Sequence, residues 1–183
     1  MRMTMTAALA ALALAGCGGS SDPDADGDGS ISMDEAAAHV DQNKGIIKPQ
    51  PGLYRGTTQL VDLTVSGASE QEAAMLKQMM GGEARTTEFC LTPEEAEKGF
   101  EEMAKQAQGS ECSFAKFDVT GGTIDAVMNC SGQGQGEAQI ALKGTGSETK
   151  SDMTMTMNAN APTGQTMTMT MRTTQERVGD CPG

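Results

Sequence analysis

Six of the seven side chains that carry oxygen atoms between residues 24 and 35 have the spacing of a metal-binding loop. They alternate along the chain at first and end with a glutamate: Asp24, Asp26, Asp28, Ser30, Ser32 and Glu35. Hard divalent cations such as calcium take about six to eight oxygen ligands in proteins, and carboxylates supply much of the charge. Carboxylates this close repel one another, and a bound cation relieves that repulsion. The spacing therefore predicts a cation site.

The order of these residues matches the calcium loop of EF-hands. The three aspartates stand at positions 1, 3 and 5, and Gly29 stands at position 6, where the loop turns sharply. In this pattern Ser30 offers its carbonyl, Ser32 holds a water and Glu35 binds through both carboxylate oxygens. The entering helix and a second loop are missing, so we expect weak binding, with a Kd of about 10⁻⁴–10⁻³ M. The alternative interpretation is a solvated acidic spacer.

The start of the chain is a short apolar run that ends in a cysteine. Arg2 precedes an apolar stretch, and Leu14-Ala15-Gly16-Cys17 resembles the bacterial lipobox. That resemblance implies cleavage before Cys17 and lipid attached to Cys17. A membrane-spanning anchor is disfavoured, because about 10 apolar residues are too few to cross ~30 Å of hydrocarbon. Gly18 follows Cys17 in place of the Asp that retains lipoproteins at the inner membrane, so we expect an outer-membrane lipoprotein facing the periplasm.

The charge of the chain excludes one large class of partners. It carries 25 acidic and 13 basic residues, a net charge of −12, and loss of Arg2 with residues 1–16 makes this about −13. No cluster of lysine and arginine provides an electrostatic footprint for nucleic acid. Anionic lipid would also repel such a chain, so we expect membrane attachment through the acyl chains at Cys17 alone.

The composition divides the chain into three parts. Residues 1–16 are the expected signal peptide, and residues 17–48 form an acidic tether that holds the loop 24–35 and a short helix. Residues 49–183 are the expected β-rich domain. Ser32 and Glu35 form a capping box for a helix through Lys44.

Two further helices begin with the same device. Ser69 and Glu72 open one that ends at Gly81, and Thr92 with Glu95 opens another that ends at Gly109. The second helix has an apolar stripe: Ala96, Phe100, Met103 and Ala107. The face expected to be exposed to solvent carries two pairs of opposite charge: Glu94 with Lys98, and Glu101 with Lys105.

Elsewhere the apolar residues repeat with period two, which indicates strands. Residues 53–65, 86–91, 112–120, 123–130, 138–142, 153–157 and 167–171 follow this pattern. Gly121-Gly122 predicts a two-residue hairpin turn. Counting back from it places Val119 opposite Ile124 and Ala115 opposite Met128. The sequence thus predicts a mainly β (α+β) fold, an antiparallel meander sheet with two or three short helices, braced by disulfides.

Four cysteines follow Cys17: Cys90, Cys112, Cys130 and Cys181. An even number in an exported chain indicates disulfides, with three possible pairings. A zinc site is disfavoured, because no Cys-x-x-Cys occurs and His39 is the one histidine. The predicted hairpin register puts the cysteines at 112 and 130 on opposite faces, which disfavours that pair. We therefore expect 90 bonded to 112 and 130 bonded to 181.

Six methionines alternate with threonine in the last two strands. If Met157 faces Met167, they line one face of the sheet as a ladder. Thioethers select Cu(I) and also adapt to apolar ligands, which gives two functional interpretations. The interpretation we favour is that methionine fills the core of a sheet that has only four Phe, one Tyr and no Trp.

Several strings of residues resemble a known family. These are Pro51-Gly52-Leu53-Tyr54, Cys90-Leu91-Thr92-Pro93-Glu94-Glu95-Ala96, and Arg177-Val178-Gly179-Asp180-Cys181. Together with Cys112 and Cys130 they resemble a proteobacterial family of exported domains of unknown function, the one numbered thirty-six seventeen, over about residues 48–182. The resemblance implies an envelope location, disulfides and a β-rich domain, and it implies no catalytic residue.

The sequence contains no Gly-x-Ser-x-Gly elbow, no Walker loop and no His-Glu-x-x-His. We therefore expect a non-enzymatic envelope lipoprotein that acts by binding or interaction, with weak calcium binding. Its partners are the membrane, through Cys17, and an envelope protein or an apolar ligand. One alternative is a carrier of an apolar ligand or Cu(I) at the methionine-lined face, and another is a carboxylate-based enzyme.

Overall fold

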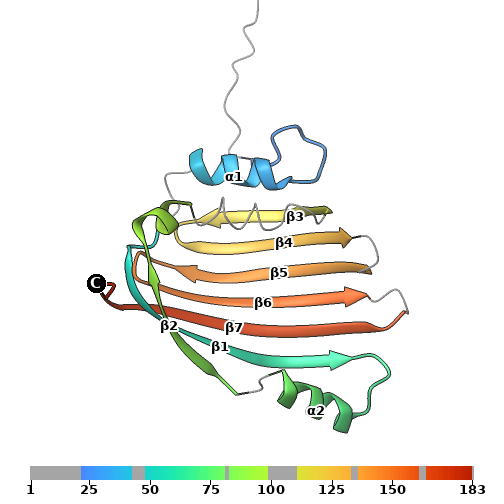
Figure 1. Ribbon diagram of the computed structural model, residues 1–183. Coiled ribbons are helices and arrows are strands. Elements are labelled where there is room, and N and C mark those ends of the chain that lie inside the picture. Colours follow the sequence, from blue (N-terminus) through green and yellow to red (C-terminus); the bar gives the residue numbers. More distant parts are fainter. Residues whose placement is uncertain are drawn as a thin grey trace, which may run out of the picture.

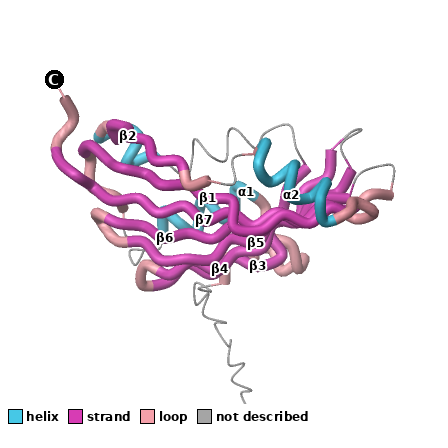
Figure 2. Tube along the Cα trace, turned by 90° about the horizontal axis from the view of Figure 1, so that it is seen from below, coloured by secondary structure: helices cyan, strands magenta, loops and turns pink. Residues whose placement is uncertain are grey.

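The strands assemble into one seven-stranded antiparallel sheet in the computed structural model, which describes residues 22–42, 48–80, 83–98, 111–132, 136–160 and 164–182. The strands are β1 (Gly52–Val65), β2 (Arg85–Leu91), β3 (Glu111–Thr120), β4 (Thr123–Gly132), β5 (Gly136–Gly146), β6 (Lys150–Asn160) and β7 (Thr166–Gly179). Their order across the sheet is β2-β1-β7-β6-β5-β4-β3 (Figure 1). Seen from below, they remain side by side in a single sheet (Figure 2).

The predicted meander is confirmed for β3 through β7, where each strand pairs with the next along the chain. The remaining two strands close the sheet in a way that strand periodicity does not reveal. β1 pairs along its length with β7, and β2 covers only the first half of β1, residues 52–58. This pairing places the start of β1 beside the end of the chain.

The hairpin of β3 and β4 follows the predicted register near its turn and departs from it further away. Val119 lies opposite Ile124, as expected, but Phe114 rather than Ala115 lies opposite Met128. A β-bulge between Phe114 and Lys116 causes the difference. A bulge adds one residue to one strand and moves every later side chain to the other face. Here it buries a phenyl ring, 6 % exposed, in place of a methyl group.

Both predicted disulfide pairings are wrong. The bonds join Cys112 to Cys130 and Cys90 to Cys181, with Cα–Cα distances of 4.1 Å and 5.4 Å. The bulge brings Cys112 directly opposite Cys130 on the same face, which removes the objection to that pair. The other bond forms because β2 and β7 flank β1, so the ends of both strands meet beside Leu53.

The six methionines share one face of β6 and β7, but their predicted partners are displaced by two residues. Met155 lies opposite Met171 and Met157 opposite Met169, while the outer two methionines face Thr173 and Ala159. An even displacement keeps every side chain on its face, so the six methionines still line one face but form two cross-strand pairs in place of three. On the other face the hydroxyls of Thr156 and Thr170 lie 3.2 Å apart.

Three helical segments begin where capping boxes predict. They are α1 (Met33–Gln42), α2 (Glu70–Met79) and residues 93–98. The Ser69 side chain accepts from the Glu72 amide, and the Glu72 carboxylate accepts from the Ser69 amide at 2.8 Å. The same reciprocal bonds join Thr92 to Glu95, and Lys98 pairs with Glu94 at 2.9 Å. The rest of the predicted third helix, including Phe100, Glu101, Met103, Lys105, Ala107 and Gly109, lies outside the described residues, as do Lys44 and Gly81.

The main buried cluster forms where α1 packs on β3 and β4. It consists of Ile31, Ala36, Phe114, Phe117, Val119 and Ala126. Figure 1 shows α1 beside β3 at one edge of the sheet and α2 at the other edge, near β1. Two members of the cluster, Ile31 at 7 % and Ala36 at 0 % exposure, come from the segment that the sequence assigns to the tether. The His39 ring meets the Phe117 ring edge-on at 6.2 Å.

Candidate metal site

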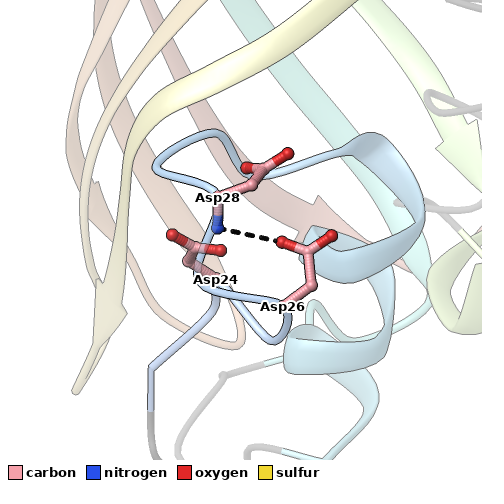
Figure 3. A group of neighbouring side chains, drawn as sticks. All are labelled: Asp24, Asp26 and Asp28. Atoms are coloured by element: carbon pink, nitrogen blue, oxygen red, sulfur yellow. Dashed lines mark hydrogen bonds between the residues drawn. The ribbon is translucent and has the colours of Figure 1, made fainter.

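The three aspartates of the loop lie together at its centre. Ligand oxygens of Asp24, Asp26 and Asp28 all lie within 4.8 Å of one another. Figure 3 shows the three side chains on a single turn of the chain, before α1. The dashed line marks the bond from the Asp28 amide to the Asp26 carboxylate, 3.1 Å long. The predicted carboxylate positions 1, 3 and 5 are thus brought into one group.

Local hydrogen bonds and two glycines shape this loop. The Asp24 carboxylate accepts from the amides of Gly27 and Gly29, at 2.8 Å and 2.9 Å. Both glycines have positive φ, 74° and 84°, a conformation in which a side chain would clash with the backbone. The Asp28 carboxylate accepts from the Ser30 amide at 2.7 Å. The sequence Asp-Ala-Asp-Gly-Asp-Gly therefore folds locally into a compact turn with its carboxylates gathered.

Glu35 links the two ends of the loop. Its carboxylate accepts from the Ser32 amide and hydroxyl, both at 2.8 Å, and from the Ala25 amide at 3.1 Å. These bonds, those from Ser32 above all, stabilise the charged form and lower the pKa of the Glu35 carboxyl. Glu35, the predicted position-12 ligand, is therefore ionised, but its carboxylate is bonded to these groups and is not part of the group that the three aspartates form.

The donor set fits a hard divalent cation. The three gathered aspartates, with Glu35 and the loop carbonyl groups nearby in the sequence, offer the oxygen ligands that calcium prefers, and this set contains no soft ligand. All four cysteines at positions 90 and beyond are used in disulfides, so none offers a thiolate. When bound, calcium would supply positive charge that orders the carboxylates; Asp24, Asp26, Asp28 and Glu35 would hold it.

One feature of the site was not expected from the sequence: the loop is attached to the edge of the sheet. Ile31 donates its amide to the Phe114 carbonyl at 2.9 Å and accepts from the Phe114 amide at 2.7 Å. Ile31 is the one large apolar residue between 18 and 32, which is the sequence signal for this attachment. The edge strand β3 thus supplies the backbone pairing that a second loop would otherwise provide.

The expected lipid site at Cys17 and residues 1–16 lie outside the described residues. Within the described ranges, no helix is both long and apolar enough to cross a bilayer.

The strings that suggested a family meet at one end of the sheet. Tyr54 is 3 % exposed, its hydroxyl donates to the Gln50 carbonyl at 2.8 Å, and its ring stacks on Phe89 at 5.7 Å. The Arg177 guanidinium donates to the Pro51 carbonyl at 2.9 Å. The Cys90–Cys181 disulfide ties β2 to the end of β7 beside them.

This end of the sheet lies within the part of the chain that a family model matches. Searches of curated proteins and of solved structures give no match. The model of a protein family of unknown function, DUF3617, matches residues 49–181, which contain every strand of the sheet but neither the loop nor α1. The chain therefore belongs to the DUF3617 family.

Proposed function

We propose that this protein is a non-enzymatic, lipid-anchored envelope protein that acts by binding, and that its loop 24–35 binds calcium weakly. The observation that carries the calcium proposal is the gathering of Asp24, Asp26 and Asp28 within 4.8 Å, with Glu35 held ionised at the end of the loop. A calcium ion there would offset the repulsion among the carboxylates.

The shifted carboxyl pKa values of the described residues run opposite to the shift that a general acid needs. A general acid needs a carboxyl group whose pKa is raised toward neutrality. Hydrogen bonds from Lys116 and Arg172 instead lower the pKa values of Asp125 and Asp152 on the polar face of the sheet. In the described part of the chain, each carboxyl group with a shifted pKa is shifted downward: Glu35, Glu72, Glu95, Asp125, Asp152 and Glu176.

Calcium binding is tested by thermal unfolding with and without the metal. With a Kd of about 1 mM, 10 mM calcium stabilises the folded state by about 1.4 kcal/mol, which is measurable as a rise in Tm. The double variant Asp26→Asn/Asp28→Asn keeps the shape of both side chains and should abolish the rise. Asp34→Asn is the matched control, because Asp34 is exposed, adjacent to Glu35 and outside the ligand positions.

Two results would contradict the calcium proposal. One is a Tm that calcium leaves unchanged in the wild-type protein. The other is a calcium-dependent rise of equal size in Asp26→Asn/Asp28→Asn and in Asp34→Asn, which would place the effect elsewhere on this acidic chain.

The anchor is tested separately in living bacteria. Labelled palmitate should be incorporated into the wild-type protein and not into Cys17→Ala, which should keep residues 1–16. Incorporation into Cys17→Ala, or a wild-type protein that keeps its first residues, would contradict lipid attachment at Cys17.

A further inference from the structure

The helix α2 exposes an apolar stripe that nothing in the described part of the chain covers. Met75, Leu76, Met79 and Met80 are 63 %, 38 %, 73 % and 49 % exposed, and α2 has no buried residue. Large apolar side chains exposed side by side often mark a binding surface. Here three of the four carry a thioether sulfur, which gives the stripe a chemistry beyond simple apolarity.

Polar contacts rather than apolar packing hold the helix in place. The Ser69–Glu72 capping box fixes its first turn, and Lys77 donates to the Val61 carbonyl of β1 at 2.7 Å. This contact orients α2 so that the ammonium group of Lys77 faces the sheet. Residues 75 and 79 are two positions behind and ahead of Lys77, which puts them on another side of the helix.

Met75 and Met79 are the two thioethers that can act together. Residues four apart lie one above the other on a helix, with Cβ atoms about 5–6 Å apart. Both side chains line the same shallow hollow, which Val65, Ala68 and Gln165 border, whereas Lys77 lines a different one. Two flexible side chains at this spacing can bring their sulfur atoms to one ion from opposite sides.

The position on the helix favours a cation. Met79 is the last residue of α2, so its thioether lies near the negative end of the helix dipole, and Met75 lies one turn before it. Thioethers select soft ions such as Cu(I) over calcium or zinc. The methionines of β6 and β7 are less suited, since they are partly buried and each faces a residue on the neighbouring strand.

We propose that Met75 and Met79 form a Cu(I) site of two thioether ligands on α2. The site is separate from the loop 24–35, which offers only hard oxygen ligands, so either site can exist without the other.

The test is a competition titration of the full mature chain, disulfides intact, with Cu(I) against a coloured Cu(I) chelator. We expect one Cu(I) per chain. Met75→Leu/Met79→Leu keeps the size, apolarity and helix preference of both residues, and it should abolish Cu(I) binding, because it removes both thioether ligands. Met80→Leu and Met169→Leu are the matched controls and should bind as the wild type does.

A spectrum locates the ion independently of affinity. With methionine methyl groups labelled with ¹³C, Ag(I), a surrogate for Cu(I) that does not change oxidation state, should shift the resonances of Met75 and Met79 and leave those of β6 and β7 in place. Unaltered Cu(I) affinity in Met75→Leu/Met79→Leu, no binding to the wild type, or shifts confined to the sheet methionines would each overturn the proposal.

Discussion

Ile31 is the residue at which the attachment of residues 31–40 to the sheet can be tested most directly. It pairs with Phe114 through two backbone hydrogen bonds, and its side chain is 7 % exposed in the main buried cluster. Ile31→Ala removes three carbon atoms from that cluster and leaves the backbone bonds possible. A domain that did not need this segment would not respond to the change.

The expected cost follows from burial. Each buried CH₂ group contributes about 0.8 kcal/mol, and the cavity left behind adds to the loss, so Ile31→Ala should lower the free energy of unfolding by about 2–4 kcal/mol. If residues 31–40 detach from the sheet in this variant, no cavity forms. The decrease in the free energy of unfolding then cannot exceed the free energy with which this segment binds to the sheet. A chain that begins at residue 43 measures this limit.

Urea unfolding followed by far-UV circular dichroism, in a chelator that removes calcium, provides the measurement. A lower midpoint at an unchanged slope reports a change in stability alone. Met75→Ala is the control, because Met75 is 63 % exposed and its truncation should change stability by about 0.5 kcal/mol or less. An Ile31→Ala protein within that same margin of the wild type would refute the docking of this segment and leave it a free tether.

Three further outcomes are expected. Gly52 has φ of 150° and a Cβ built on it would lie 2.6 Å from the Gly179 carbonyl oxygen and against Arg177, so Gly52→Ala should cost about 1–3 kcal/mol; an unchanged Tm would contradict this packing. In Cys90→Ser, a maleimide should label Cys181, whereas labelling of Cys112 would indicate a bond between Cys90 and Cys112 in the wild type. Loss of the Cys90–Cys181 bond, which spans 91 residues, should lower the free energy of unfolding by about 5 kcal/mol. Loss of the Cys112–Cys130 bond, which spans 18 residues, should lower it by about 3 kcal/mol. Hydrogen bonds from Ser69 lower the pKa of Glu72, so its contribution to stability is complete above about pH 5 and is lost as the pH falls through the lowered folded-state pKa. The difference in Tm between wild type and Glu72→Gln should therefore narrow toward acid, and a difference that widens would contradict the capping box.

Much of the local structure could be predicted because its causes are local. Ser69 with Glu72, and Thr92 with Glu95, satisfy the first amides of their own helices, so the pattern is enough to place a helix start. The Gly121-Gly122 turn fixes the first pairs of its hairpin, such as Val119 with Ile124, in the same way. The Asp-Gly turns of the calcium loop also depend on bonds between near neighbours, such as Asp24 with Gly29.

The errors arose where a distant contact decides. The bulge at Ala115 places Phe114 in the buried cluster under α1, a contact with an element far away in the sequence, and the alternation within β3 does not reveal it. The extra residue moves Cys112 to the same face as Cys130, and both predicted disulfide pairings are wrong as a result.

By itself, the sequence determined the type and start of the helices, the alternation of the strands, the grouping of the loop carboxylates and the family. Each of these depends on residues a few positions apart, or on strings of residues that can be compared directly. Only the tertiary structure decided which cysteines meet, that β1 returns to pair with β7, and that Ile31 attaches the loop to β3. Those contacts join residues from 18 to more than 100 positions apart, and their free energy comes from burial shared among several elements, which no single segment encodes.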